Sequence, residues 1–440
     1  MQTENIINAT LLNIVAALLI FFAGIFLLSE AETSREYSMF VTYISAFFSL
    51  TYILVFMYVS KQISYIYISL ALSIFTFKCL IGVLHYLVFM DGEYFATGAF
   101  SYLNDHEWLL TSSTRTASHW QEFGITSIPI DFQADKNTFL IPYFSLVFYL
   151  GDNYHFLNFT ILNSLHNMLT AVLVASFSTL YVGRQTAQVI FIIALIQPFG
   201  LFSSILWRDS VGQTFLVMGV IMIMQYAVNK KNFNLAFLGV FLMALLRNIY
   251  LFAGILSLFY FSLRSKKKTL ILKFVNILTV LTLVSIFYIY FYDFTMNLYD
   301  FSNKSISYNL DVLDFFKKII ISFLGPFPWL QIFNPEVPGR EYLLADIFQA
   351  TYNLAIMFLL AVHLINTKTK FRSYLNQTAL GMIIIISMLG VLSYGHVSYV
   401  TVGSVLLLPI LNTISLRKFL KVWFSIITIN FTLSIIWYAI

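Results

Sequence analysis

The sequence is poor in charged residues and contains a single cysteine. Asp, Glu, Lys and Arg together make up only 10% of its 440 residues, whereas a soluble domain averages about 25%. This scarcity excludes a soluble globular protein, a disordered chain and a classical nucleic-acid-binding protein. With only Cys79, a disulfide within the chain and a cysteine-rich metal site are also excluded. Because Cys79 lies in an apolar run, we expect a packed thiol there.

The motifs of the common soluble enzymes are missing as well. The sequence has no Walker A loop, no GxSxG nucleophile turn and no HExxH zinc motif. Its seven histidines are scattered, and we expect His85 and His166 to be hydrogen-bonded core residues rather than ligands. The sequence therefore predicts neither a metal site nor a cofactor.

Apolar residues are abundant instead: 59% of the chain is hydrophobic, and its mean hydropathy is +0.82. A helix needs roughly 17–25 predominantly apolar residues to cross a bilayer. Runs near this length occur at 11–28, 39–59, 66–88, 157–180, 186–206, 211–228, 271–291, 346–366, 377–394, 398–414 and 421–440. The pattern predicts an all-α, polytopic integral membrane bundle of about 11–13 transmembrane helices, forming one domain over residues 1–440.

Three further segments do not fit a simple crossing. Residues 138–150 give only a short run, interrupted by Pro142, and residues 319–335 are broken by Gly325, Pro326 and Pro328, so we expect both segments to be re-entrant or interfacial. Residues 235–263 are too long for one helix. We expect them to form a hairpin of two short helices with Arg247 at its tip.

With this topology, most Lys and Arg residues collect on one face of the membrane. They are Lys61, Arg184, Lys230, Lys231, Arg264, Lys266, Lys267, Lys268, Lys273, Lys368, Lys370, Arg372, Arg417, Lys418 and Lys421. By the positive-inside rule that face is the cytoplasmic one, and the N-terminus lies on it. Residues 91–137 and 292–345 then form two extracytoplasmic regions. The first is rich in acidic and aromatic residues, so we expect a loop that lies on the membrane surface.

Ionisable residues beside the hydrocarbon are the best candidates for a site, because a charge is costly there. Asp91 and Glu93 follow the third apolar run, under the aromatic-rich loop. A carboxylate in that position suits a general base that accepts a proton from a hydroxyl. Its structural alternative is a solvated acid at a helix end.

The cationic candidates fall on the same predicted face. Arg208 and Asp209 form a polar break between two apolar helices, and Arg247 has apolar sequence on both sides. Arginine keeps its charge, and its fork of donors fits a phosphate. We predict that these three residues, with Arg340 and His396, bind the phosphate or glycan of a substrate. Local ion pairs or surface loop charges are the structural alternatives.

Carboxylates and arginines on one face fit glycosyl transfer from a lipid phosphate donor. The acid would take the proton of the acceptor hydroxyl, and the arginines would stabilise the negative charge that builds on the phosphate leaving group. No nucleotide is expected on that face.

The segments DGEYFATGA at 91–99, FYLGDN at 148–153 and WRDS at 207–210, followed by a basic loop and Arg247, carry a family resemblance. The chain resembles polytopic bacterial envelope glycosyltransferases of the GT-C type and the repeat-unit polymerases of O-antigen, capsule and exopolysaccharide clusters. The resemblance, which covers about residues 85–263, implies that Asp91 matches the first-loop acid of the GT-C pattern. Here the acidic loop follows the third helix rather than the first, and a soluble C-terminal domain is not evident. Both departures favour a polymerase.

The resemblance implies transfer of a growing glycan from one polyprenyl diphosphate carrier onto a new lipid-linked unit, in the bacterial inner membrane. The partners it implies are the polyprenyl-linked oligosaccharide, the lipid bilayer, and flippase and chain-length regulator proteins, without nucleic acid. One alternative is a GT-C transferase that uses a polyprenyl-phosphate sugar. The other is a lipid-linked oligosaccharide flippase or another transporter. A transporter should carry charges within its helices, and Lys78, which can snorkel toward the cytoplasm, is the clearest such charge.

Overall fold

The computed structural model describes residues 2–29, 35–85, 103–125, 127, 140–151, 156–179, 182–198, 209–229, 233–246, 254–255, 258, 340–366 and 414–439. Over these residues all long elements are α-helices. In chain order they are α1 (Gln2–Ser29), α2 (Arg35–Val59), α3 (Tyr65–His85), α4 (Leu103–Phe123), α5 (Leu140–Gly151), α6 (Phe156–Ser178), α7 (Arg184–Leu195), α9 (Asp209–Asn229), α10 (Phe233–Leu246), α16 (Arg340–Asn366) and α20 (Leu416–Ala439).

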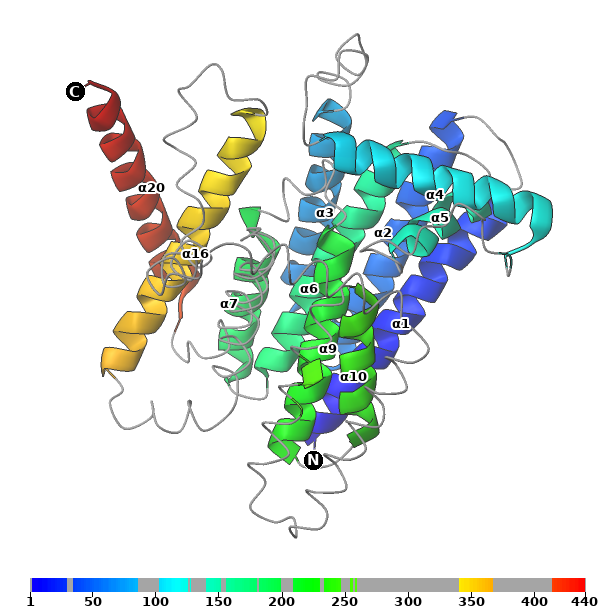
Figure 1. Cartoon of the computed structure of the whole chain (residues 1–440). Coiled ribbons are helices and arrows are strands. Elements are labelled where there is room, and N and C mark those ends of the chain that lie inside the picture. Colours follow the sequence, from blue (N-terminus) through cyan, green and yellow to red (C-terminus); the bar gives the residue numbers. More distant parts are fainter. Residues whose placement is uncertain are drawn as a thin grey trace.

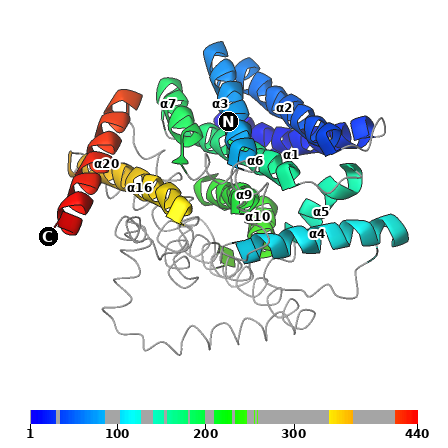
Figure 2. The ribbon, with the colours of Figure 1, turned by 90° about the horizontal axis from the view of Figure 1, so that it is seen from above.

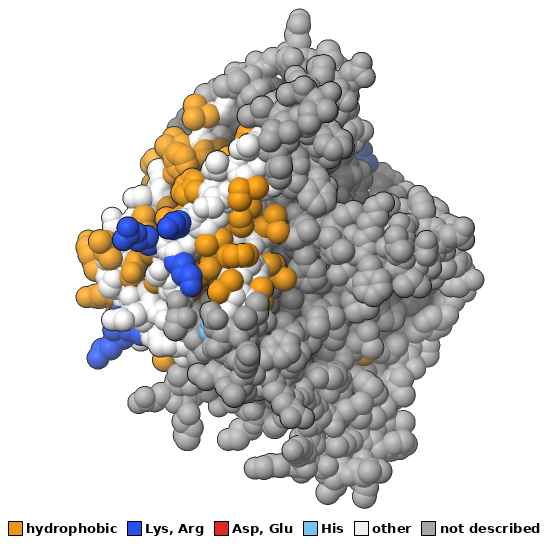
Figure 3. Space-filling view, turned by 90° about the vertical axis from the view of Figure 1, so that its left-hand side faces the viewer, with side chains coloured by type: hydrophobic (Ala, Val, Ile, Leu, Met, Phe, Trp, Pro, Cys, Tyr) orange, Lys and Arg blue, Asp and Glu red, His pale blue; other side chains and the backbone are white. Residues whose placement is uncertain are grey.

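Four of these helices are long and apolar enough to cross a membrane: Ile6–Ser29, Tyr37–Val59, Tyr65–Leu84 and Leu157–Ser178. They coincide with the first four apolar runs of the sequence, so the prediction of apolar helices there is confirmed. Large apolar side chains on the outer faces of α1 to α3 are exposed, as a lipid-facing surface requires; they include Leu12, Leu19, Phe48, Phe77 and Leu84. Figure 3 shows the side of the molecule that holds α20, where apolar side chains cover much of the described surface.

The segments that do not fit a simple crossing are described in part. Residues 138–150 contain α5, whose 12 residues span only about 18 Å, less than the hydrocarbon thickness of about 30 Å. A short helix there agrees with a re-entrant or interfacial segment. In residues 235–263, α10 ends at Leu246, directly before the predicted tip at Arg247. Arg247 and residues 319–335 lie outside the described residues.

The two ends of the bundle are distinct. Figure 1 shows the N-terminus at one end, called here the N-terminal end, and α4 lying across the helices at the other, called here the α4 end. The turn between α2 and α3 carries the exposed Lys61, and the exposed Arg184 opens α7; both lie at the N-terminal end. Helix α3 ends at the α4 end, and α9 and α16 begin there, whereas α10 runs from the N-terminal end only about halfway along the bundle.

Helix α4 occupies residues 103–123 of the region 91–137, for which the sequence predicted an extracytoplasmic surface loop. Its exposed positions include Thr111, Arg115, Ser118 and Glu122, which recur at helical spacing. Its buried positions, Leu109, Ser113, Thr116, Ala117 and Trp120, do the same. This amphipathic period was present in the sequence and is the signal that identifies the helix.

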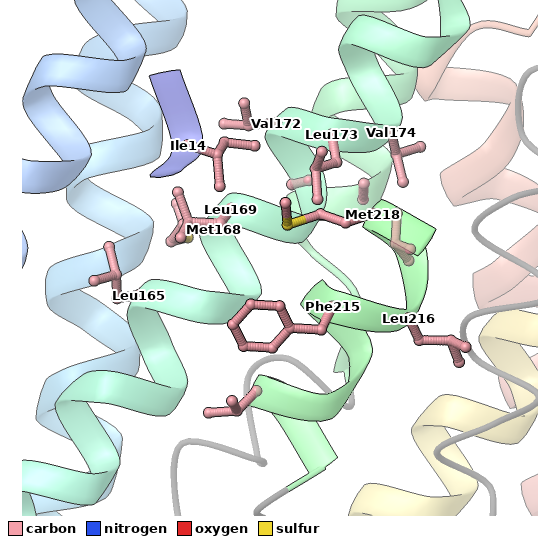
Figure 4. Packing of buried hydrophobic residues seen from close by; sticks show 14 of the residues in the cluster. Ile14, Leu165, Met168, Leu169, Val172, Leu173, Val174, Phe215, Leu216 and Met218 are labelled. Carbon is pink, nitrogen blue, oxygen red and sulfur yellow. The ribbon is translucent and has the colours of Figure 1, made fainter. Parts of the chain in front are cut away.

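Helix α6 is the centre of the bundle. It contacts α1, α2, α3, α7 and α9, and Figure 2 shows it between α1–α3 on one side and α9–α10 on the other. Its spanning window is entirely buried, whereas less than half of each other spanning window is. Figure 4 shows how Leu169 and Leu173 of α6 pack beside Phe215 and Met218 of α9. A helix enclosed in this way has little contact with lipid.

The turn after α2 places a lysine in a backbone conformation that favours glycine. Lys61 has a φ of 60°, and the backbone N–H groups of Lys61 and Gln62 donate to the carbonyls of Tyr58 and Met57 over 2.9 and 2.8 Å. This is the Schellman arrangement that closes a helix, in which the left-handed residue is usually glycine.

Replacing Lys61 by glycine is expected to stabilise the protein by about 0.5 kcal/mol, because glycine adopts a positive φ without steric cost. The measurement is reversible unfolding of the purified protein in detergent. Lys61→Ala is the matched control, since it removes the charge but keeps the Cβ. An equal gain in Lys61→Ala would show that charge, rather than backbone strain, sets the effect.

Candidate functional site

Helix α6 is buried along its whole length, yet it carries many polar side chains. They are Asn158, Thr160, Asn163, Ser164, His166, Asn167, Thr170, Ser176 and Ser178, all buried. Polar groups inside a membrane protein are costly unless they are hydrogen-bonded, and they gather at functional positions. Their hydrogen bonds therefore decide which of them hold the fold together and which are free to meet a ligand.

One group of polar contacts joins α6 to α5 and α9. The Tyr143 hydroxyl lies 2.7 Å from Nε2 of His166 in a buried hydrogen bond. The ring of Phe215 packs against both of these rings, with centroid distances of 5.6 Å. The expectation that His166 is a hydrogen-bonded core residue is confirmed, and so is the buried position of the free Cys79 thiol.

Two threonines fix α9 against the same turn of α6. The hydroxyl of Thr214 donates to the backbone carbonyl of His166 over 2.8 Å. The Thr170 hydroxyl donates to the same carbonyl over 3.1 Å, and the two hydroxyls lie 3.0 Å apart. The hydroxyl groups of Thr170 and Thr214 are therefore both hydrogen-bonded within the fold.

Four polar atoms of α6 are buried without a hydrogen-bond partner in the described part of the chain: Oδ1 of Asn158, Oγ1 of Thr160, Oδ1 of Asn163 and Nδ1 of His166. Thr160, Asn163 and His166 are spaced by three, so they follow one another along one side of the helix. We call this set the unpaired face of α6. Each such atom costs about 1–3 kcal/mol unless a water or a ligand satisfies it.

Helix α3 brings a lysine to the same part of the bundle. Lys78 is only 1% exposed and shares the buried side of α3 with Ala71, Phe75 and Gly82. Its neighbour Cys79 forms a side-chain hydrogen bond with Ser164 of α6, the residue after Asn163. Over the described residues, no carboxylate forms an ion pair with Lys78. The side chain of Lys78 thus lies inside the bundle rather than on its surface.

The site residues predicted from the sequence are described only in part. Asp209 and Arg340 are the first residues of α9 and α16, both of which begin at the α4 end. The side chains of these two residues, and all of Asp91, Glu93, Arg208, Arg247 and His396, lie outside the described residues. The predicted site thus stays a prediction.

Sequence reasoning missed the unpaired face of α6 and the burial of Lys78. The sequence did contain a signal for the unpaired face of α6, because polar residues recur every three or four positions through the apolar run 157–180. That pattern predicts a helix with a polar side. Which neighbour the polar side meets is a matter of tertiary packing.

The arrangement offers hydrogen-bonding atoms and one cationic side chain inside the half of the bundle nearer the α4 end. Such a set suits a ligand that bears hydroxyl groups and an anionic group. Over the residues that the structure describes, no group of three or more His, Cys, Asp or Glu residues could hold a metal ion.

Comparisons with known proteins found no protein similar to this chain. No protein-family model, no curated protein and no solved structure matches the chain.

Proposed function

We propose that the protein is an integral membrane glycosyltransferase of cell-surface polysaccharide assembly, acting as a repeat-unit polymerase on polyprenyl-diphosphate-linked glycans. The observation that carries the proposal is the unpaired face of α6, a row of buried polar atoms in an enclosed membrane helix. Sugars present hydroxyl groups that can donate to and accept from such atoms. The family resemblance of residues 85–263 supports the same chemistry.

The orientation follows from charge. In the proposal the chain crosses a bacterial inner membrane about 11–13 times, with its N-terminus in the cytoplasm. The exposed Lys61 and Arg184 at the N-terminal end support this orientation. The α4 end is then extracytoplasmic, where lipid-linked repeat units are joined without nucleotide sugars.

In the proposed reaction, the hydroxyl oxygen of the acceptor sugar attacks the anomeric carbon of the donor glycan. A C–O bond to the acceptor forms, and the bond between the anomeric carbon and the diphosphate breaks. Asp91 or Glu93 takes the hydroxyl proton, and polyprenyl diphosphate leaves with the bonding electron pair. Arg208, Arg247 and Arg340 stabilise its charge.

A lipid-linked oligosaccharide flippase is the second candidate function, and one observation favours it. Lys78 is a buried ionisable residue inside an apolar helix, which is a common mark of a transport pathway. A GT-C transferase with a polyprenyl-phosphate sugar donor would use the same acid and arginines as the polymerase.

Gel analysis of surface polysaccharide from a deletion strain tests the proposal. We expect the deletion to reduce the ladder of chain lengths to single repeat units and the wild-type gene to restore it. Asp91→Asn and Arg247→Ala should each fail to restore it, with a loss of at least about 100-fold for the acid. Glu122→Gln, which changes an exposed carboxylate of α4, is the matched control and should restore the ladder.

The other outcomes separate the alternatives. Complete loss of surface glycan would contradict a polymerase and favour an earlier transferase or the flippase. An unchanged ladder in the deletion strain would contradict all three. Restoration by Asp91→Asn would remove that acid from the mechanism while leaving the activity in place.

A further inference from the structure

We infer that Lys78 of α3 and the unpaired face of α6 form a binding site for the phosphate group of a lipid. The inference rests on the proposed function, because it names the part of the protein that holds the polyprenyl diphosphate of the substrate. It does not involve the residues proposed above for catalysis.

The first argument is the charge of Lys78. Its ammonium group has three donors and no acceptor, and the side chain is 1% exposed. A buried charge is retained at such a position only with a counter-charge or a strong acceptor. No carboxylate of the described residues supplies one. A phosphate bound beside Lys78 would supply both.

The second argument is the chemistry of the neighbouring helix. The Cys79–Ser164 hydrogen bond sets the level at which α3 meets α6. Ser164 directly follows Asn163, the middle residue of the unpaired face. The Thr160 hydroxyl can donate to a phosphate oxygen. Oδ1 of Asn163 can accept from a hydroxyl group of the first sugar, and Nδ1 of His166 donates to or accepts from a second one, according to which ring nitrogen carries the proton.

The third argument favours a lipid over a free phosphate. The side of α3 opposite to Lys78 carries exposed Phe77, Leu80 and Leu84. Only this one helix separates Lys78 from the apolar surface of the bundle. Lys78 lies seven residues before the last residue of α3, or about 10 Å along the axis. A lipid could therefore keep its chain along α3 in the bilayer while its phosphate reaches the lysine.

Binding of short-chain analogues tests the inference directly. The purified protein in nanodiscs is titrated with farnesyl diphosphate, farnesol and inorganic pyrophosphate. We expect farnesyl diphosphate to bind at least about tenfold more tightly than farnesol, and Lys78→Met to weaken its binding by about tenfold. Lys78→Arg should retain most of the affinity. Lys61→Met removes an exposed lysine at the N-terminal end and should bind as the wild type does.

The single cysteine provides a second test that needs no lysine substitution. N-ethylmaleimide modification of the wild-type protein can report only on Cys79, which is next to Lys78. We expect farnesyl diphosphate to slow this modification and farnesol to leave its rate unchanged. Cys79→Ser gives the background. Equal rates with and without farnesyl diphosphate would overturn the assignment of the site.

Two further results would overturn the inference: Lys78→Met binding as tightly as the wild type, or inorganic pyrophosphate binding as tightly as farnesyl diphosphate. The proposed function fails separately. If binding depends on Lys78 but deletion of the gene leaves the polysaccharide ladder unchanged, the site stands and the polymerase does not. If the deletion reduces the ladder to single repeat units while Lys78→Met binds normally and restores the ladder, the polymerase stands and the site does not.

Discussion

Replacing Gly239 by alanine is expected to destabilise the protein by about 2 kcal/mol. Helices α9 and α10 cross at Gly239 and Gly219. A Cβ built at Gly239 would lie 2.6 Å from the carbonyl oxygen of Gly219 and 3.0 Å from Cβ of Met222. Backbone atoms cannot rotate away as a side chain can, so the two helices must separate. Small residues at such crossings let membrane helices approach closely.

The matched control for this prediction is the same substitution elsewhere in the hairpin. Gly212 lies in α9, and a Cβ there would meet nothing within 4 Å. Gly212→Ala should therefore be neutral or slightly stabilising, because alanine favours a helix over glycine. Unfolding of the three proteins in detergent gives the comparison. Equal stability of Gly239→Ala and Gly212→Ala would contradict the close approach of the two helices.

Replacing Asn163 by leucine is expected to lower polymerisation by at least about tenfold while leaving the folded protein as stable as the wild type or more so. Oδ1 of Asn163 is buried without a hydrogen-bond partner in the described part of the chain. Leucine removes this unsatisfied atom, which favours the folded state, but it also removes an acceptor that the glycan would use. The thermal unfolding midpoint and the polysaccharide ladder measure the two effects.

Ser176→Ala, on the same helix, should show the opposite behaviour. The Ser176 hydroxyl donates to Oε1 of Gln62 over 2.6 Å and accepts from Thr10 over 3.2 Å. Its loss should cost about 1 kcal/mol of stability and leave the ladder intact. If Asn163→Leu instead lost stability and kept activity, the unpaired face would be part of the fold rather than of a site.

Only part of the candidate site can be recognised from local sequence. The carboxylates and arginines were predicted because a charged residue next to an apolar run can be identified from the sequence alone. The polar side of α6 is equally visible as a pattern. A sequence cannot show, however, which polar atoms find partners, because Ser176 is satisfied by residues 114 and 166 positions away.

The sequence by itself determined the four long apolar helices and the packed positions of Cys79 and His166. The physical reason is that a backbone in hydrocarbon must satisfy its own hydrogen bonds, so an apolar run of bilayer length becomes a helix. Tertiary structure alone decided that α6 is enclosed, that α4 lies across one end of the bundle, and that Lys78 is buried against α6. Those outcomes depend on contacts between segments far apart in the chain, which local periodicity does not encode.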